Sequence, residues 1–206
     1  VDIDLEKFMA RDKNGKINSS EINVALIQTA YPFLKTIKED HLLADKENKK
    51  NFHRHLSDML QLLLKTFKAQ KLINGNLSGV NLIIFPELSI HEEDSYILER
   101  FADKMNCIIF CGVMFRAHPM KPDTLINSGL WLIPQDRDKN KGRSFIRLLQ
   151  GKKYLTSIEQ NLSIESYRPV QWIIRAYLED EGKSIEDSSR RIYHWTLSSS
   201  ICYDST

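Results

Sequence analysis

Short apolar runs alternate with helically spaced apolar positions along much of this chain. Residues 23–30, 80–85 and 107–115 are apolar runs bounded by turn-forming or polar residues, which predicts buried strands. Between these runs, apolar positions recur at helical spacing over residues 52–67 and 92–105, which predicts two helices that each bury one face. Strands and helices mixed in this order indicate an α/β layered fold.

The later part of the chain predicts a hairpin and a final strand. Residues 127–134 and 144–149 have strand character and are separated by a polar turn. Residues 171–178 fit either a helix or a strand, and the polar stretch 179–191 predicts an insertion or loop. Residues 192–202 then predict the last strand.

The first 22 residues differ from the rest because they are polar. We expect residues 1–22 to be a linker or the end of a preceding domain, and the α/β domain to cover residues 23–206. The chain begins with Val1 rather than methionine, so we expect an upstream domain in the same polypeptide. A turn at residues 12–16 has the spacing of a calcium loop, but Ala10 occupies the position of its first carboxylate ligand. The pattern therefore favours a linker or hairpin over a calcium site.

Composition narrows the class of protein. Hydrophobic residues make up 42% of the chain and charged residues 27%, which is ordinary for a globular domain. The net charge of +2 provides no strong field for nucleic acid, and no apolar stretch approaches the ~20 residues of a membrane span. Three cysteines do not make a disulfide framework, so we expect a reducing, cytoplasmic setting with Cys107 and Cys111 in the core.

Three polar residues follow predicted strands and together suggest nucleophilic chemistry. Cys202 ends the last strand, Glu87 follows an apolar run and a proline, and Lys152 follows a glycine. Taken singly, each has an ordinary explanation as a packed thiol or a solvated charge. Together they suit a cysteine nucleophile. A thiol with a pKa of ~8.5 needs a base or a nearby cation to react at neutral pH, and a glutamate can take up the thiol proton. Strand ends converge on one edge of an open sheet, so we expect the three to meet there.

The segments Phe85-Pro86-Glu87-Leu88, Lys152-Lys153-Tyr154-Leu155 and Ile201-Cys202-Tyr203-Asp204 resemble, in order, the three signature regions of the nitrilase, or carbon–nitrogen hydrolase, superfamily. The resemblance covers residues 23–206. It implies an α-β-β-α sandwich, of which this chain would hold the N-terminal part, because it ends just after the cysteine. One departure is Tyr154, where family members often have histidine.

The resemblance also implies roles for individual residues. Glu87 would be the general base, Lys152 the cation on the tetrahedral intermediate, and Cys202 the nucleophile. Glu159 resembles a second glutamate that orients the substrate or the lysine. His194 lies eight residues before Cys202 on the same predicted strand, so a cysteine–histidine arrangement has little support.

The implied activity is hydrolysis of non-peptide C–N bonds in amides or nitriles through a thioester. The family needs no metal or organic cofactor, and its members commonly form homo-oligomers. The alternative is a nitrilase-like effector, sensor or assembly module within a larger bacterial anti-phage defence reverse transcriptase. A nitrilase-fold scaffold without activity is a third interpretation.

Overall fold

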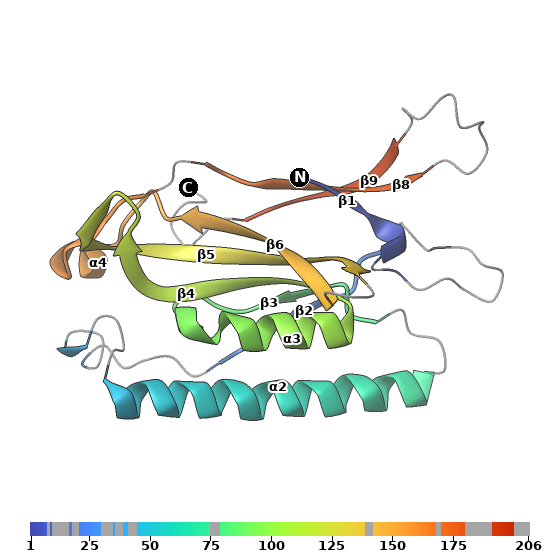
Figure 1. The fold of residues 1–206 in the computed structure, drawn as a ribbon, viewed down its shortest axis with the longest axis horizontal. Coiled ribbons are helices and arrows are strands. Elements are labelled where there is room, and N and C mark those ends of the chain that lie inside the picture. The colour runs from blue at the N-terminus through green and yellow to red at the C-terminus, as the bar shows by residue number, and fades with distance from the viewer. Residues whose placement is uncertain are drawn as a thin grey trace.

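The computed structural model describes residues 1–7, 9, 17, 21–29, 35, 39–40, 45–74, 79–138, 142–167, 170–179 and 191–199. Within this part of the chain, two long helices, a six-stranded sheet and a three-stranded sheet lie in successive layers (Figure 1). This arrangement confirms the expected α/β class. It contains three layers, α-β-β, of the four that the family resemblance implies.

The six-stranded sheet has the order β2-β3-β4-β5-β6, with β7 beside β5. Its strands β2, β3 and β4 are parallel, and β4, β5 and β6 form an antiparallel meander. The bounds are β2 Val24–Leu26, β3 Leu82–Ile84, β4 Ile108–His118, β5 Lys121–Asp138, β6 Gly142–Gly151 and β7 Ile164–Glu165. Each predicted strand up to residue 149 therefore exists, and the hairpin strands are longer than expected.

The first of these strands is less buried than its sequence predicted. Among the described residues β2 has β3 as its one neighbour, so it lies at the edge of the sheet. Val24 is 45% exposed and Leu26 is 77% exposed. On the opposite face Ala25 and Ile27 pack against the core, which is why the strand still forms.

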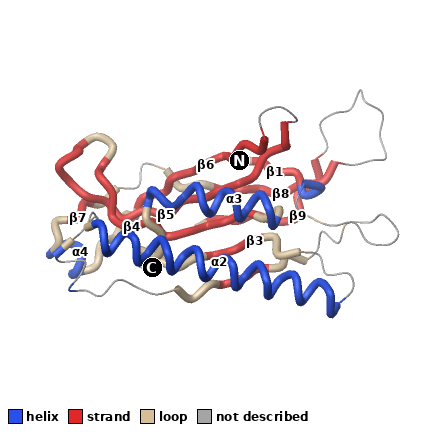
Figure 2. Tube along the Cα trace, turned by 60° about the horizontal axis from the view of Figure 1, so that its bottom comes forward, coloured by secondary structure: helices blue, strands red, loops and turns tan. Residues whose placement is uncertain are grey.

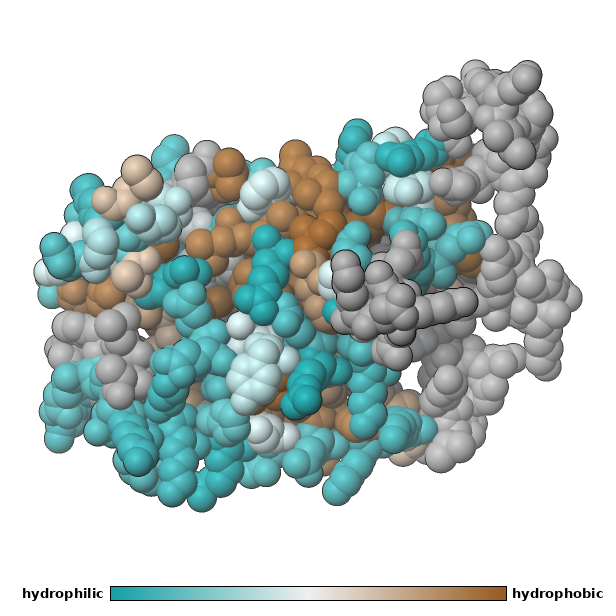
Figure 3. Space-filling view, in the orientation of Figure 1, coloured by the Kyte–Doolittle hydropathy of each residue, from teal (hydrophilic) through white to brown (hydrophobic). Residues whose placement is uncertain are grey.

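Helices α2 (Lys46–Asn74) and α3 (Ser95–Met105) cover one face of this sheet (Figure 2). Leu56 and Leu60 of α2 and Leu98 and Phe101 of α3 form one core with residues of β3, β4 and β5. Hydrophilic side chains cover the outer side of α2, and hydrophobic ones appear mainly at the level of the sheets (Figure 3). Neither α2 nor another described helix has the length and apolar character that crossing a membrane requires.

The three-stranded sheet packs on the other face. Its order is β1-β8-β9, with bounds β1 Asp2–Asp4, β8 Ile173–Glu179 and β9 Arg191–Ser198. The segment that fitted either a helix or a strand is thus a strand. Between the two sheets a second core forms from residues of both; among them are Trp131, Ile133, Leu148, Ile174 and Ala176.

The N-terminal residues pack against the rest of the chain. Strand β1 pairs in parallel with β8, and Arg175 of β8 donates its backbone N–H to the carbonyl of Val1 at 2.8 Å. Ile3, Leu5 and Met9 are buried in the core between the sheets. Residues 1–7 and 9 therefore pack with the two sheets, because their apolar side chains fill the space between them; the domain division after residue 22 stays a prediction.

Candidate active site

Glu87 lies directly after β3 in a tightly packed turn. A Cβ atom on Gly112 of the neighbouring strand β4 would lie 2.3 Å from the Cα of Glu87 and 2.5 Å from the carbonyl oxygen of Pro86. Only a glycine permits this approach. The hydroxyl of Ser89 donates to the same Pro86 carbonyl at 2.7 Å, and Leu88 adopts a φ of 54°. The turn thus holds the Glu87 backbone firmly beside β4.

Lys152 follows β6, and both its backbone N–H and its backbone carbonyl are hydrogen-bonded. Its N–H donates to the carbonyl of Asn127 at 3.0 Å, and its own carbonyl accepts from the N–H of Tyr167 at 2.9 Å. A Cβ atom on the preceding Gly151 would lie 1.6 Å from the Tyr167 carbonyl oxygen, so this position also requires glycine. The Lys152 side chain is 1% exposed. A lysine so deeply buried needs anionic partners.

Glu159 supplies one of those partners from the short helix α4 (Ser157–Asn161). Thr156 caps this helix: its hydroxyl accepts from the Glu159 N–H, and its own N–H donates to Oε2 of Glu159 at 2.8 Å. The Thr156 hydroxyl donates to the same oxygen at 2.9 Å. This reciprocal capping box aims the Glu159 carboxylate back toward the start of α4, where Lys152 lies.

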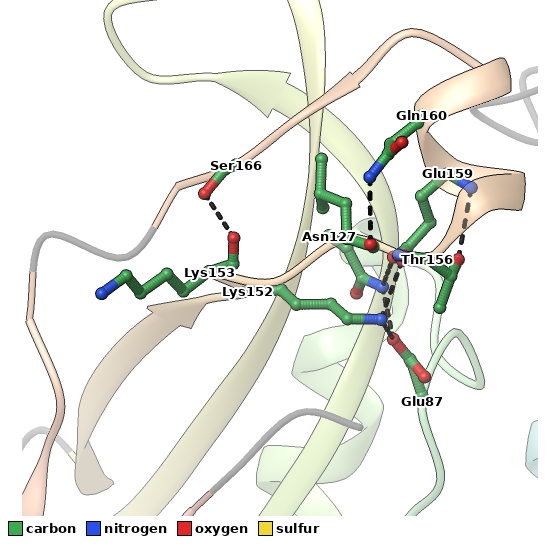
Figure 4. Close-up of polar contacts among 9 residues, drawn as sticks. Glu87, Asn127, Lys152, Lys153, Thr156, Glu159, Gln160 and Ser166 are labelled. Carbon is green, nitrogen blue, oxygen red and sulfur yellow. Dashed lines mark hydrogen bonds and ion pairs between the residues drawn. The ribbon is translucent and has the colours of Figure 1, made fainter. Parts of the chain in front are cut away.

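The buried cluster consists of Glu87, Lys152, Glu159 and Asn127 (Figure 4). Nζ of Lys152 lies 3.0 Å from Oε1 of Glu87 and 2.8 Å from Oε2 of Glu159. Nδ2 of Asn127 donates to the same Oε1 of Glu87, and to Oε1 of Glu159 at 2.6 Å. Two donors therefore bridge the two carboxylates, one cationic and one neutral.

The charges of the cluster stabilise one another. Burial disfavours the ammonium, but hydrogen bonds to Glu159 and Glu87 outweigh it and raise the pKa of Lys152. Burial likewise disfavours the Glu159 carboxylate, yet hydrogen bonds from Lys152 and Asn127 outweigh it and lower the pKa of Glu159. Lys152 and Glu159 therefore form an ion pair that stays charged at neutral pH.

Two hydrogen-bonding positions of the cluster are not used by the described residues. Oε1 of Glu87 accepts from both Lys152 and Asn127, whereas no described residue donates to Oε2. Two of the three ammonium hydrogens of Lys152 are used, which leaves one for another acceptor. Of the three charged side chains in this cluster, Glu87 is also the most exposed, at 19%. A proton acceptor and a cationic donor are thus available side by side.

Two of the three cysteines are unsuited to act as nucleophiles. Cys107 and Cys111 are fully buried, and burial raises the pKa of each thiol to about 12. They belong to the core under α3, as expected. Cys202 lies outside the described residues.

The end of β9 is fastened to the strand that leads to Lys152. The hydroxyl of Ser199 accepts from Nε1 of Trp131 at 2.9 Å and donates to Oε1 of Gln150 at 2.8 Å. Nε2 of Gln150 donates to the Ser199 carbonyl at 2.7 Å. Gln150 precedes Lys152 by two residues, and Ser199 precedes Cys202 by three. This buried network therefore ties the chain just before Cys202 to β6.

Three of the four residues singled out in the sequence, Glu87, Lys152 and Glu159, thus contact one another within the described structure. Asn127, the fourth member of the cluster, is not among the residues that the sequence singles out. Its signal is the polar pair Asn127-Ser128, which interrupts the apolar residues of a predicted strand. That signal indicates a buried polar role but not its partners.

Comparisons with known proteins give no family assignment. No protein-family model and no curated protein matches this chain. Among solved structures, a crystal structure of N-terminal amidase matches with a TM-score of 0.41 and 13% identity, covering 68% of this chain and 35% of that one. The same amidase with a Gln-Val peptide gives a TM-score of 0.42 and 13% identity, covering 86% of this chain and 38% of that one. The chain thus spans little more than a third of these structures, and TM-scores below 0.5 decide nothing about the chemistry of the cluster.

Proposed function

We propose that this protein is a cysteine-dependent hydrolase of C–N bonds in small-molecule amides or nitriles. Cys202 is the nucleophile, Glu87 the general base, and Lys152 the cation that stabilises the oxyanion. The observation that supports the proposal is the buried contact between Lys152 and Glu87, in which one carboxylate oxygen and one ammonium hydrogen remain available. These two residues come from two of the three segments that resemble nitrilase signature regions.

In the first step the sulfur of Cys202 bonds to the carbonyl carbon of the amide. The thiol proton goes to Oε2 of Glu87, the oxygen to which no described residue donates. The electron pair of the carbonyl moves onto its oxygen. The remaining hydrogen of the Lys152 ammonium donates to this oxyanion, and the buried position strengthens that interaction.

In the second step the C–N bond breaks and its electrons go to the nitrogen. The nitrogen takes the proton from Glu87 and leaves as ammonia or an amine, so a thioester on Cys202 remains. Water then adds to the thioester carbon while Glu87 takes its proton, the C–S bond breaks with its electrons going to sulfur, and Glu87 returns the proton to the sulfur. For an amide the products are a carboxylic acid, ammonia or an amine, and the free thiol, and one water is consumed; a nitrile consumes two waters to give the acid and ammonia.

The anchor at Ser199 supports the choice of Cys202 as the nucleophile. Three residues of extended chain span at most about 10–11 Å. Gln150, which binds Ser199, lies two residues before Lys152, a distance of ~7 Å along a strand. The tether is therefore long enough to bring the thiol to the cluster.

Two assays test the proposal. The first measures ammonia release from a panel of primary amides and nitriles. The second measures, by peptide mass spectrometry, how fast iodoacetamide alkylates each cysteine. We expect Cys202 to be alkylated at pH 6–7, well below the pH at which an ordinary thiol reacts. Cys202→Ala and Glu87→Gln should each abolish ammonia release. Glu47→Gln, which neutralises an exposed carboxylate on α2, is the matched control and should leave it unchanged. Full activity in Cys202→Ala would refute the assignment.

The alternative, a nitrilase-like effector, sensor or assembly module of an anti-phage defence reverse transcriptase, stays a prediction. Reading the gene on both sides of this chain tests it, because a polymerase palm with paired aspartates would be encoded next to it. Homo-oligomerisation also stays a prediction, and light scattering of the purified protein tests it.

A further inference from the structure

We propose that Asn127 is a positioning residue for this reaction. By donating to the carboxylates of both Glu87 and Glu159, it fixes which oxygen of Glu87 acts as the base. This inference rests on the function proposed above. The residue lies on β5 and is 1% exposed, so no solvent replaces its hydrogen bonds.

The geometry assigns both hydrogens of the Asn127 amide nitrogen. One points to Oε1 of Glu87 and the other to Oε1 of Glu159. The opposite orientation of the amide would place Oδ1 against two carboxylate oxygens, which is repulsive. An amide is the side chain with two hydrogens on one neutral nitrogen, so it joins two carboxylates without adding charge.

The charge balance explains why such a donor is needed. Two carboxylates share a single ammonium, so the cluster has one excess negative charge when all three groups are ionised. The titratable groups that face Asn127 are Glu87 from the turn after β3, Glu159 from α4 and Lys152 from the end of β6. Its neutral donor lowers the repulsion between the carboxylates while Lys152 keeps a hydrogen available.

The two carboxylates depend on Asn127 to different degrees. Glu159 also accepts hydrogen bonds from Lys152 and from both the N–H and the hydroxyl of Thr156. Glu87 accepts from Lys152 and Asn127 and, among the described residues, from no other group. Loss of the Asn127 donor therefore removes half of the hydrogen bonds to the proposed base and a quarter of those to Glu159.

The oxygen of the Asn127 amide shows which hydrogen bonds hold the side chain. Oδ1 is buried and has no hydrogen-bond partner in the described structure. A buried acceptor without a partner is destabilising, so the two hydrogen bonds that the amide nitrogen donates are what hold this orientation. The Asn127 backbone carbonyl also accepts the backbone N–H of Lys152, so Asn127 contacts two of the ionised groups directly and the backbone of the residue that carries the third.

The test is the pH dependence of Cys202 alkylation by iodoacetamide in Asn127→Leu and in the isosteric Asn127→Asp. Both variants remove the amide donor, so the Glu87 carboxylate is held less firmly and helps the thiol less to ionise. We expect the pH of half-maximal rate to rise by at least about one unit, a fall of about tenfold in rate at pH 6. A merely structural role would lower stability, measured by urea denaturation, without moving this profile.

Ser128→Ala is the matched control, because Ser128 is the next residue on β5, is equally buried, and has a hydroxyl without a partner in the described structure. Its alkylation profile should match that of the wild type. If the wild type itself shows an ordinary thiol profile and Glu87→Gln does not change it, the proposed function fails. If Glu87→Gln shifts the profile but neither Asn127 variant does, the positioning role alone is refuted. Should Asn127→Leu not fold, Asn127→Asp decides by the same criterion.

Discussion

Replacing Lys152 with methionine removes the cation that bridges Glu87 and Glu159 while keeping most of the side-chain volume. The two carboxylates then remain buried, with Asn127 as their shared donor. Because the Lys152 side chain is 1% exposed and that of Glu159 is 6% exposed, water cannot replace the lost ammonium without opening the cluster. This substitution therefore tests whether the cluster is held together by charge.

The magnitude follows from the distances. At an effective dielectric constant of about 20, unit charges 2.8 Å apart attract by ~6 kcal/mol, and those 3.0 Å apart by ~5.5 kcal/mol. Desolvation of the ammonium offsets much of this attraction in the wild type. Removing one partner of a buried ion pair nevertheless costs about 3–5 kcal/mol, because the remaining charge stays buried. Since Glu87 is partly exposed, most of this cost arises at Glu159.

The assay is urea denaturation of Lys152→Met and the wild type at pH 7 and pH 5. With a denaturant slope of about 2 kcal/mol per molar, the midpoint at pH 7 should fall by roughly 1.5–2.5 M. At pH 5 the deficit should shrink, because without Lys152 a buried carboxylate binds a proton more readily in the folded state than in the unfolded chain. Stability of the variant therefore rises, relative to the wild type, as the pH falls.

Lys153→Met is the matched control, since it makes the same chemical change at the adjacent, exposed residue. It should alter the free energy of unfolding by no more than about 0.5 kcal/mol. A Lys152→Met protein that is within 1 kcal/mol of the wild type at pH 7, or whose deficit is equal at both pH values, would refute the electrostatic account.

Three further outcomes are expected. Gly112→Ala should lower the free energy of unfolding, measured by urea denaturation, by about 1–3 kcal/mol and should impair turnover, because the new Cβ would overlap the turn after β3. Gly79→Ala is its control: open space surrounds Gly79, so the free energy of unfolding should not change. Burial raises the pKa of the Cys107 and Cys111 thiols to about 12, so both should resist alkylation by iodoacetamide at pH 8 until urea unfolds the protein. Alkylation of either thiol in the native protein would show that this core opens readily. The pKa of Glu159 is lowered from 4.5 in the folded state, so its stabilising contribution is present above that value and is lost as the pH falls through the folded value. Glu159→Gln should therefore lose less stability than the wild type between pH 5 and pH 3, and an equal loss would contradict this sign.

Much of the site could be predicted from local sequence because local signals end its strands. Pro86 cannot extend a ladder of backbone hydrogen bonds, so the turn that presents Glu87 follows directly from the apolar run before it. Gly151 similarly marks the end of β6 before Lys152. The capping box between Thr156 and Glu159 is likewise a local pattern, although the sequence alone does not show that its carboxylate reaches a lysine.

The N-terminal strand and the role of Asn127 could not be predicted in this way. Strand β1 has a single apolar residue, Ile3, between two aspartates, and it pairs with a strand about 170 residues away. A polar tripeptide with so distant a partner has no periodicity to distinguish it from a linker. Asn127 likewise looks like any polar residue in a strand until the register places it between two carboxylates.

By itself, the sequence determined the main strands and helices between residues 23 and 149 and which polar residues stand at their ends, because hydrophobic period and turn chemistry are local properties. The tertiary structure alone decided that Glu87 and Lys152, 65 positions apart, lie 3.0 Å from each other. That distance depends on the register of β3, β4, β5 and β6 and on two glycines that let backbones approach closely. Glutamate and lysine usually lie at the surface, where water screens their charges. At this buried site the Glu87 carboxylate and the Lys152 ammonium are screened much less, so they form an ion pair.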